Sequence, residues 1–204
     1  MFDSSEDKQS EEEEEHPILR EFLVTALQIL SVVTILVLIP YLISGIWPPY
    51  VSVVSGSMEP NIDKGDMILV VENHRYSEND SVNGIQTAAK AGNKQFNREG
   101  DVILYYPNGD RQETPIIHRA ITHADEGENW VRDVDKEYLP ADSCERVNNC
   151  PAQHDGFITL GDNNEAYDQS GGISSPVKTE WVYSKAQYRI PYLGWIRIFL
   201  SSMI

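Results

Sequence analysis

The chain opens with a polar, acidic stretch and then changes to a long apolar one. Residues 1–15 include five consecutive glutamates and few apolar side chains, a composition that cannot bury enough apolar surface to fold. From Phe22 to Trp47 there is no charged residue, and Leu, Ile and Val dominate. About 25 helical residues extend about 37 Å, enough for a tilted membrane span. The pattern predicts an acidic, disordered tail over residues 1–21 and a transmembrane helix over residues 22–47, with Pro40 as a candidate kink.

A cleavable signal peptide is the alternative interpretation of this apolar stretch. A signal peptide has an apolar core of about 7 to 15 residues followed by a small-residue cleavage site, whereas this stretch is longer and no Ala-x-Ala follows it. A retained signal-anchor is therefore favoured. Lys8 and Arg20 precede the span, and no Lys or Arg follows it until Lys64. The positive-inside rule predicts a single-pass protein of the cell membrane with a cytoplasmic N-terminus.

After the span, short apolar runs alternate with turn residues, which is the pattern of β-strands. The remaining residues, 48–204, are a usual number for one domain with its own core. Two polar segments, near residues 72–97 and 135–156, are predicted as surface insertions. We therefore expect a mainly β fold: an N-terminal transmembrane helix followed by a β-rich extracytoplasmic domain. The expected strands are Met67–Val71, Val102–Tyr106, Ile116–Thr122, Trp130–Val134, Phe157–Leu160 and Thr179–Ile190.

The C-terminal run from Ile190 to Leu200 is apolar, but it is too short to span a membrane and Arg197 interrupts it. Two placements stay open for this run. It could lie in the membrane interface, or it could pack on the domain.

The net charge of −16 changes the picture of partners and environment. Acidic residues outnumber basic ones both in the first 21 residues and in the rest of the chain. This balance argues against nucleic acid or an anionic lipid surface as a partner, because phosphate binding needs clustered Lys and Arg. The acidity instead suggests a salt-rich environment, where molar salt screens the repulsion between carboxylates, and so a halophilic, archaeal protein. An acidic mesophilic protein is the alternative.

Two cysteines, Cys144 and Cys150, lie in a polar stretch of the predicted external part, where a small-loop disulfide is plausible. A zinc site would need more Cys or His at short spacing, and His154 is the nearby candidate, so no metal is expected. No nucleotide-binding or metalloprotease motif is present, and no cofactor is expected. The remaining histidines without a motif, His16, His74 and His123, are expected at the surface together with His154.

Three motifs carry candidate chemistry, in order along the chain. Ser57 lies in Ser55-Gly56-Ser57-Met58-Glu59-Pro60, about ten residues past the span. His118 lies in the apolar run Ile116-Ile117-His118-Arg119-Ala120-Ile121, and Gly161-Asp162-Asn163-Asn164 begins a segment that ends at Asp168. Taken alone, each motif also has a purely structural interpretation. Ser57 would be a turn residue, His118 a core histidine and Asp162 part of a turn.

Together with the anchor, the Gly-Asp turns at Gly65 and Gly100 and a C-terminal Pro-Tyr-Leu-Gly, these motifs resemble the type I signal peptidase family. One branch of that family uses a Ser-Lys dyad, and the archaeal and endoplasmic-reticulum branch uses serine with histidine and aspartate; His118 indicates the second. The resemblance implies a signal-peptidase-type catalytic domain. It also implies Ser57 as nucleophile, His118 as general base, Asp168 as the triad aspartate and Asp162 as support. The Ser55 hydroxyl and the Ser57 N–H are the expected oxyanion donors.

The sequence thus predicts a membrane-bound serine endopeptidase, signal peptidase I, that cleaves N-terminal signal peptides from exported preproteins at the outer membrane face. The expected partners are preprotein signal peptides, the lipid bilayer and the protein translocation machinery. Two alternatives stay open. One is a specialised peptidase for a narrow set of membrane-anchored substrates, and the other is a non-catalytic anchored β domain that binds export partners.

Overall fold

The structure is a computed structural model that describes residues 17–92 and 94–201. The chain divides into two compact units, one up to Leu42 and one from Ile43 onward. Most of the predicted acidic tail, residues 1–16, lies outside the described residues, and so does His16.

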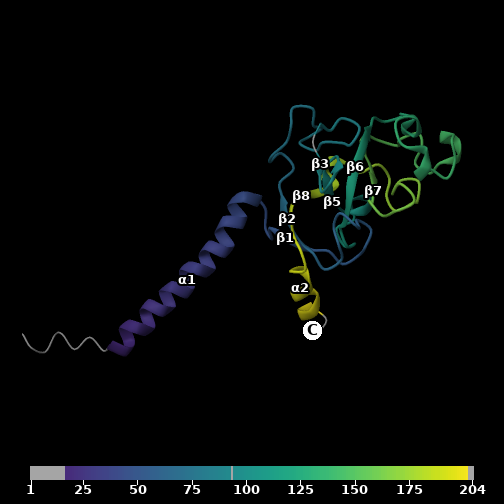
Figure 1. Cartoon of the computed structure of the whole chain (residues 1–204). Coiled ribbons are helices and arrows are strands. Elements are labelled where there is room, and N and C mark those ends of the chain that lie inside the picture. The colour runs from purple at the N-terminus through teal and green to yellow at the C-terminus, as the bar shows by residue number, and fades with distance from the viewer. Residues whose placement is uncertain (1–16, 93, 202–204) are drawn as a thin grey trace, which may run out of the picture. The chain divides into compact units, whose positions relative to one another are not determined.

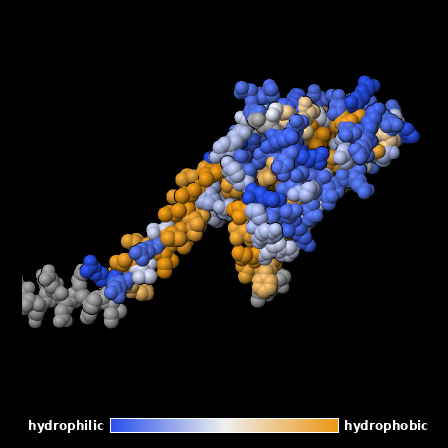
Figure 2. Space-filling model, in the orientation of Figure 1, coloured by the Kyte–Doolittle hydropathy of each residue, from blue (hydrophilic) through white to orange (hydrophobic). Residues whose placement is uncertain are grey.

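The first unit is the long helix α1, Pro17–Ser44 (Figure 1). It begins five residues before the predicted span and contains Pro40. Among the described residues, one helical stretch, Leu19–Ser44, is long and apolar enough to cross a membrane, and none of it up to Ile43 is buried. Figure 2 shows apolar residues along most of this helix. A helix satisfies its backbone hydrogen bonds internally, which is what the interior of a bilayer demands.

The second unit is built on a six-stranded sheet in which all neighbouring strands are antiparallel (Figure 1). Its spatial order is β1-β2-β8-β5-β6-β7. The short strands β3, Lys94–Gln95, and β4, Arg98–Glu99, pair separately. The prediction of a long apolar helix followed by a mainly β domain is confirmed. The six strands are β1 Tyr50–Ser52, β2 Met67–Val71, β5 Val102–Tyr105, β6 Ile116–Ala124, β7 Gly156–Leu160 and β8 Val182–Ile190.

Apolar side chains cover both faces of the sheet, and strand β5 is an example. It lies between β8 and β6, and all four of its residues are buried. Because side chains alternate along a strand, Val102 and Leu104 join one apolar cluster with Met58, whereas Ile103 and Tyr105 join another on the opposite face. Because the first cluster contains Met58, the residue after Ser57, it holds the Ser57 loop against the sheet.

One predicted strand is wrong. Residues around Trp130 form a 3-10 turn, Trp130–Arg132, because Trp130 and Val131 are buried in a local core rather than in the sheet. A second 3-10 turn, Thr179–Trp181, occupies the start of the predicted last strand. The strands β1, β3 and β4 were not predicted; each has only two or three residues, too few for an alternating pattern.

The C-terminal apolar run contains a short helix, α2, Gly194–Ser201. It contacts β1, yet Trp195, Ile196, Phe199 and Leu200 remain exposed. Figure 2 shows apolar residues gathered on this helix. The helix therefore packs on the domain and also presents apolar surface.

The predicted insertions differ from simple surface loops. The first buries Ile85 and Thr87 against the domain. The second is closed by a disulfide between Cys144 and Cys150, with 5.1 Å between the two Cα atoms, so the expected pairing is confirmed. Val147 and Ala152 of the second insertion join a buried apolar cluster that we call the core of the insertion, whose other buried members are Ala124, Trp130, Val131, Ile158, Leu160 and Tyr167.

Candidate active site

Ser57 lies in a tight turn between β1 and β2. The Glu59 N–H donates to the Gly56 carbonyl at 3.2 Å, and the Ile62 N–H donates to the Met58 carbonyl at 2.9 Å. The turn is held to the core by Met58, which is buried. Ser57 itself is half-buried, and its Oγ lies 3.4 Å from the Ser55 Oγ. Within the described residues the Ser57 N–H donates to no protein acceptor, so this donor is available to a ligand.

His118 comes from β6 and is buried beside Asp168. Its Nδ1 lies 2.9 Å from Oδ1 and 2.7 Å from Oδ2 of the Asp168 carboxylate. The side chain of Asp168 is fully buried, and that of His118 is nearly so. A buried carboxylate in this position makes Nδ1 the hydrogen-bond donor, which leaves Nε2 as the nitrogen free to accept a proton.

Two further side chains hold the Asp168 carboxylate. The Tyr105 hydroxyl donates to Oδ2 at 2.7 Å, and the Thr159 hydroxyl donates to the same oxygen at 2.6 Å. Burial and then the Asp168 charge raise the pKa of Tyr105 well above its usual value of 10.0, so its hydroxyl stays a donor. The sequence analysis missed both residues, because Tyr105 and Thr159 lie in ordinary apolar strands and no local motif marks them.

Ser57 and His118 line one cleft of about 670 Å³. Most of its surface is apolar, and its lining includes residues 51–55, Ser57, residues 114–118, and Arg197 and Ile198 of α2. No hydrogen bond joins Ser57 to His118 within the described part of the chain; the Ser57 hydroxyl contacts Ser55 instead. Catalytic hydrogen bonds are often long in ligand-free enzymes and shorten when substrate binds. The cleft therefore brings the two groups together without a preformed bond.

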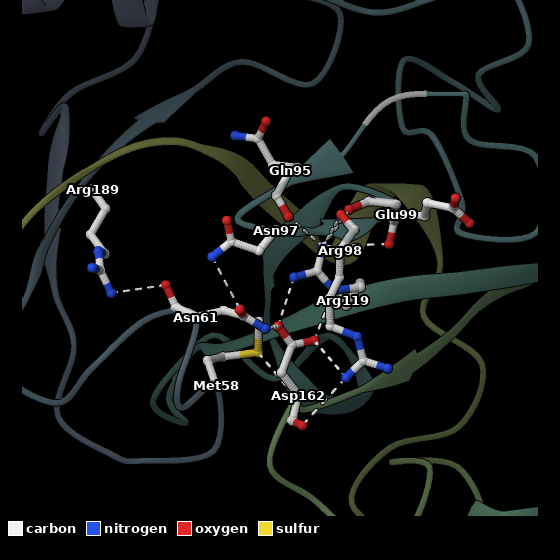
Figure 3. Close-up of polar contacts among 10 residues, drawn as sticks. Met58, Asn61, Gln95, Asn97, Arg98, Glu99, Arg119, Asp162 and Arg189 are labelled. Carbon is white, nitrogen blue, oxygen red and sulfur yellow. Dashed lines mark hydrogen bonds and ion pairs between the residues drawn. The ribbon is translucent and has the colours of Figure 1, made fainter.

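Asp162 lies away from His118 and pairs with Arg119, the next residue on β6 (Figure 3). Arg119 Nε donates to Oδ1 at 2.8 Å and Nη2 donates to Oδ2 at 2.7 Å, a two-pronged contact between side chains that are 1% and 2% exposed. Arg119 Nη1 also donates to the Gly100 carbonyl at 2.7 Å. A charged residue inside the apolar run of β6 was the available sequence signal, since a buried charge needs a partner.

The Gly-Asp-Asn-Asn turn packs directly on the Ser57 loop. The Asn163 N–H donates to the Ser57 carbonyl at 2.8 Å, and Asn61 Nδ2 donates to Asp162 at 2.8 Å (Figure 3). A side chain at Gly161 would lie 2.7 Å from the Ser57 carbonyl, which explains the glycine there. Asp162 and its turn therefore position the serine loop, while Asp168 contacts the histidine.

The three other histidines that the structure describes are not among the residues that line this cleft. His74 is exposed, as predicted, but His123 and His154 are half-buried, with their rings against Phe157 and Trp181. Across residues 17–92 and 94–201, no group of three or more His, Cys, Asp or Glu side chains could hold a metal ion.

Comparison with known proteins gives one consistent similarity. No family model matches the chain. The chain is 26% identical over 156 residues to the signal peptidase complex catalytic subunit SEC11 of Saccharomyces cerevisiae, in strains YJM789, RM11-1a and JAY291 alike. The match covers 75% of this chain and 66% of each relative, slightly under two thirds of the relatives' length. This chain is thus distantly similar to a signal peptidase catalytic subunit.

Proposed function

We propose that this protein is a membrane-bound serine endopeptidase that removes signal peptides from exported preproteins. The observation that carries the proposal is that Ser57 and His118 line the same apolar cleft, and that His118 is paired there with the buried Asp168. The distant similarity to the yeast catalytic subunit supports the same activity. Ser57 is the proposed nucleophile, His118 the general base and Asp168 the group that orients His118.

In the proposed reaction, the Ser57 hydroxyl attacks the carbonyl carbon of the scissile peptide bond while His118 Nε2 takes its proton. The carbonyl electrons move onto the oxygen, which the Ser57 N–H and the Ser55 hydroxyl stabilise. The C–N bond then breaks, and His118 returns its proton to the leaving amine. A water molecule then attacks the ester carbonyl carbon while His118 takes its proton; the bond to Ser57 Oγ breaks, His118 returns the proton to that oxygen, and the new C-terminal carboxyl group of the signal peptide is released.

The lining of the cleft supports a peptide substrate. Residues 51–55 and 114–118 would contact a peptide bound there, and the apolar lining favours small apolar side chains. A pocket discriminates one methylene by only about 1–3 kcal/mol, so side-chain size alone selects weakly. Anchoring through α1 would confine enzyme and preprotein to one membrane surface and add to selection by raising their effective concentration.

We also propose the topology that this function requires. The helix α1 would cross the cell membrane once with its N-terminus in the cytoplasm, and residues 48–204 would form the extracytoplasmic peptidase domain with its two insertions. Arg20, at the N-terminal end of this helix, supports this orientation. Preproteins, the bilayer and the translocation machinery are the partners that this placement implies.

The test is cleavage of a preprotein by membranes that carry the wild-type chain, Ser57→Ala or His118→Ala. Cleavage is expected to fall by on the order of 10⁴-fold or more in each variant, because the two side chains act as a unit. Thr34→Ala, a change within α1, is the control for expression and insertion. Undiminished cleavage by Ser57→Ala in equal amounts of inserted protein would favour a non-catalytic anchored domain. Cleavage restricted to a few preproteins would favour the specialised peptidase.

A further inference from the structure

The segment that carries Asp168 lies between β7 and the disulfide-closed loop of the second insertion. We call residues 167–170 the aspartate segment and residues 144–150 the disulfide loop. On one side, the Asp168 N–H donates to the Thr159 carbonyl at 3.0 Å, and the Thr159 N–H donates to Gln169 Oε1 at 2.9 Å. These bonds attach the segment to β7.

On the other side, two asparagines of the disulfide loop donate to carbonyls of the aspartate segment. Asn149 Nδ2 lies 2.9 Å from the Gln169 carbonyl, and Asn148 Nδ2 lies 3.1 Å from the Ser170 carbonyl. Both acceptors belong to residues that are buried. The two amides therefore replace water as partners of the backbone next to Asp168.

The conformation of Asn149 makes these contacts specific. Its φ is +56°, in the left-handed region that Asn tolerates better than most residues. Its own carbonyl accepts from Trp130 Nε1 at 2.7 Å, and the next residue is Cys150 of the disulfide. The side-chain amide is thus aimed by its backbone, and the backbone is held by the covalent ring and by Trp130.

Tyr167 makes a second attachment of the aspartate segment to the insertion. Its ring lies edge-on to Trp130 and to Tyr138, with centroids 6.0 Å and 5.9 Å away. Its hydroxyl donates to the Asp135 carbonyl at 3.1 Å, and burial raises the pKa of Tyr167 to about 12, which keeps that donor protonated. The residue before Asp168 is therefore embedded in the core of the insertion.

We propose that the disulfide loop is a positioning element for the active site, with Asn148 and Asn149 as positioning residues that hold the Asp168 backbone. This inference rests on the proposed function, since it assigns Asp168 a role through His118. Neither asparagine touches the cleft, so they act on the reaction only through Asp168 and His118. The second insertion is accordingly part of the catalytic scaffold rather than a loop added at the surface.

The test uses the full-length chain in detergent with Asn149→Gly, which keeps the left-handed backbone accessible and removes only the amide. The matched control is Asn83→Gly in the first insertion, because Asn83 has φ +50° and its amide donates to Thr179 Oγ1 at 3.0 Å. We expect Asn149→Gly to lower kcat by on the order of tenfold or more with KM unchanged, because small displacements of catalytic groups are costly. Asn83→Gly is expected to leave both constants near those of the wild type.

Two further measurements separate positioning from unfolding. The first is the melting temperature of each variant, and all assays are run below the lowest of these values. The second is the downfield proton NMR resonance of the His118 Nδ1–H, which reports the contact with Asp168 and needs no substrate. This resonance should weaken or move in Asn149→Gly and in the double variant Cys144→Ala/Cys150→Ala, but not in Asn83→Gly. A resonance and a kcat that change no more in Asn149→Gly than in Asn83→Gly would overturn the inference.

The outcomes also distinguish this inference from the proposed function. If Ser57→Ala abolishes cleavage while Asn149→Gly behaves like Asn83→Gly, the peptidase stands and the positioning role fails. If Ser57→Ala still cleaves, the proposed function fails, and the His118 resonance still reports whether the disulfide loop holds Asp168.

Discussion

Two neighbouring residues of β6 each contact one aspartate of the same downstream segment. His118 lies against Asp168, and Arg119 is paired with Asp162. Because adjacent side chains on a strand point to opposite faces, the two pairs lie on opposite sides of β6. The His118 pair faces Tyr105, and the Arg119 pair holds the turn that supports Ser57. The two aspartates therefore differ in their contacts, and we expect them to differ in function.

The first prediction separates these two aspartates. Asp162→Asn should lower the free energy of unfolding by about 3–5 kcal/mol, because it leaves the buried Arg119 charge without its counter-ion. Asp168→Asn should lower kcat by on the order of 10⁴-fold with a smaller loss of stability, because His118 loses the group that sets its tautomer. Urea unfolding and single-turnover cleavage measure the two effects.

The exposed Asp142→Asn is the control for this pair of substitutions. A pattern in which Asp162→Asn lost activity but kept its stability would contradict the division of roles.

Tyr105→Phe tests the buried carboxylate from its other side. Loss of the hydroxyl removes one donor to Asp168 and should lower the free energy of unfolding by about 1.5–3 kcal/mol near neutral pH. Burial raises the pKa of Tyr105 above 10.0, so the wild type keeps its contribution below that pH and loses it as the pH rises further. The difference between wild type and variant should therefore shrink above pH 10.0.

Tyr106→Phe, at the next position on the chain, is the control for the Tyr105 experiment. Denaturant unfolding at neutral and alkaline pH is the measurement. A difference that stays constant across the whole pH range would argue against the raised pKa.

At the scale of elements, each residue of the candidate site is carried by a strand or by a segment next to a strand. The edge strand β1 leads into the Ser57 loop, β6 carries His118, and the chain after β7 carries both aspartates. The helix α2 packs next to β1 and borders the cleft. The ring of Trp195, which belongs to α2, lies against the turn at Gly65, which has φ +91°.

Gly65→Ala tests how α2 is seated. A Cβ at this position would lie 1.9 Å from Trp195 Nε1, so the ring must move. Gly127→Ala is the matched control, because Gly127 has φ +81° and nothing lies within 4 Å of the added carbon. The free energy of unfolding should fall by about 1–2 kcal/mol in Gly127→Ala, because of the left-handed backbone alone, and by more in Gly65→Ala. Equal melting temperatures for the two variants would show that the contact between Gly65 and Trp195 does not hold α2 in place.

At the scale of the whole molecule, charge sets the conditions under which the fold is stable. The net charge is −16, and the acidity extends along the whole chain. Like charges destabilise a compact state through mutual repulsion, and salt screens that repulsion. The halophilic, archaeal origin inferred from this composition remains a prediction.

Raising KCl from about 0.1 M to about 1 M shortens the screening length from about 10 Å to about 3 Å and should raise the melting temperature of the full-length protein. The control is the same increase in KCl near pH 4.6, the pI of the sequence, where the net charge is close to zero and little repulsion is left to screen. Thermal unfolding followed by circular dichroism measures the effect. A melting temperature that is flat or falls with KCl would favour an ordinary acidic protein.

The sequence by itself determined the elements whose pattern is local. An uncharged apolar stretch predicts α1, and apolar runs between Gly-Asp turns predict β2 and β5, since burial and turn chemistry act within a few residues. The motifs and their resemblance to signal peptidases also singled out Ser57, His118 and two aspartates, Asp162 and Asp168, as candidate site residues. Their catalytic roles stay predictions.

Tertiary structure decided what depends on residues far apart in the chain. That Asp168 rather than Asp162 lies beside His118 follows from how the turn after β7 packs on Arg119 and the Ser57 loop. Trp130 was predicted in a strand, but it is buried by Tyr167 in the core of the insertion, which overrides its β propensity. Tyr105, Thr159 and Asn149 reach the aspartate segment across the fold, and no local pattern records such contacts because they exist only after the strands have paired.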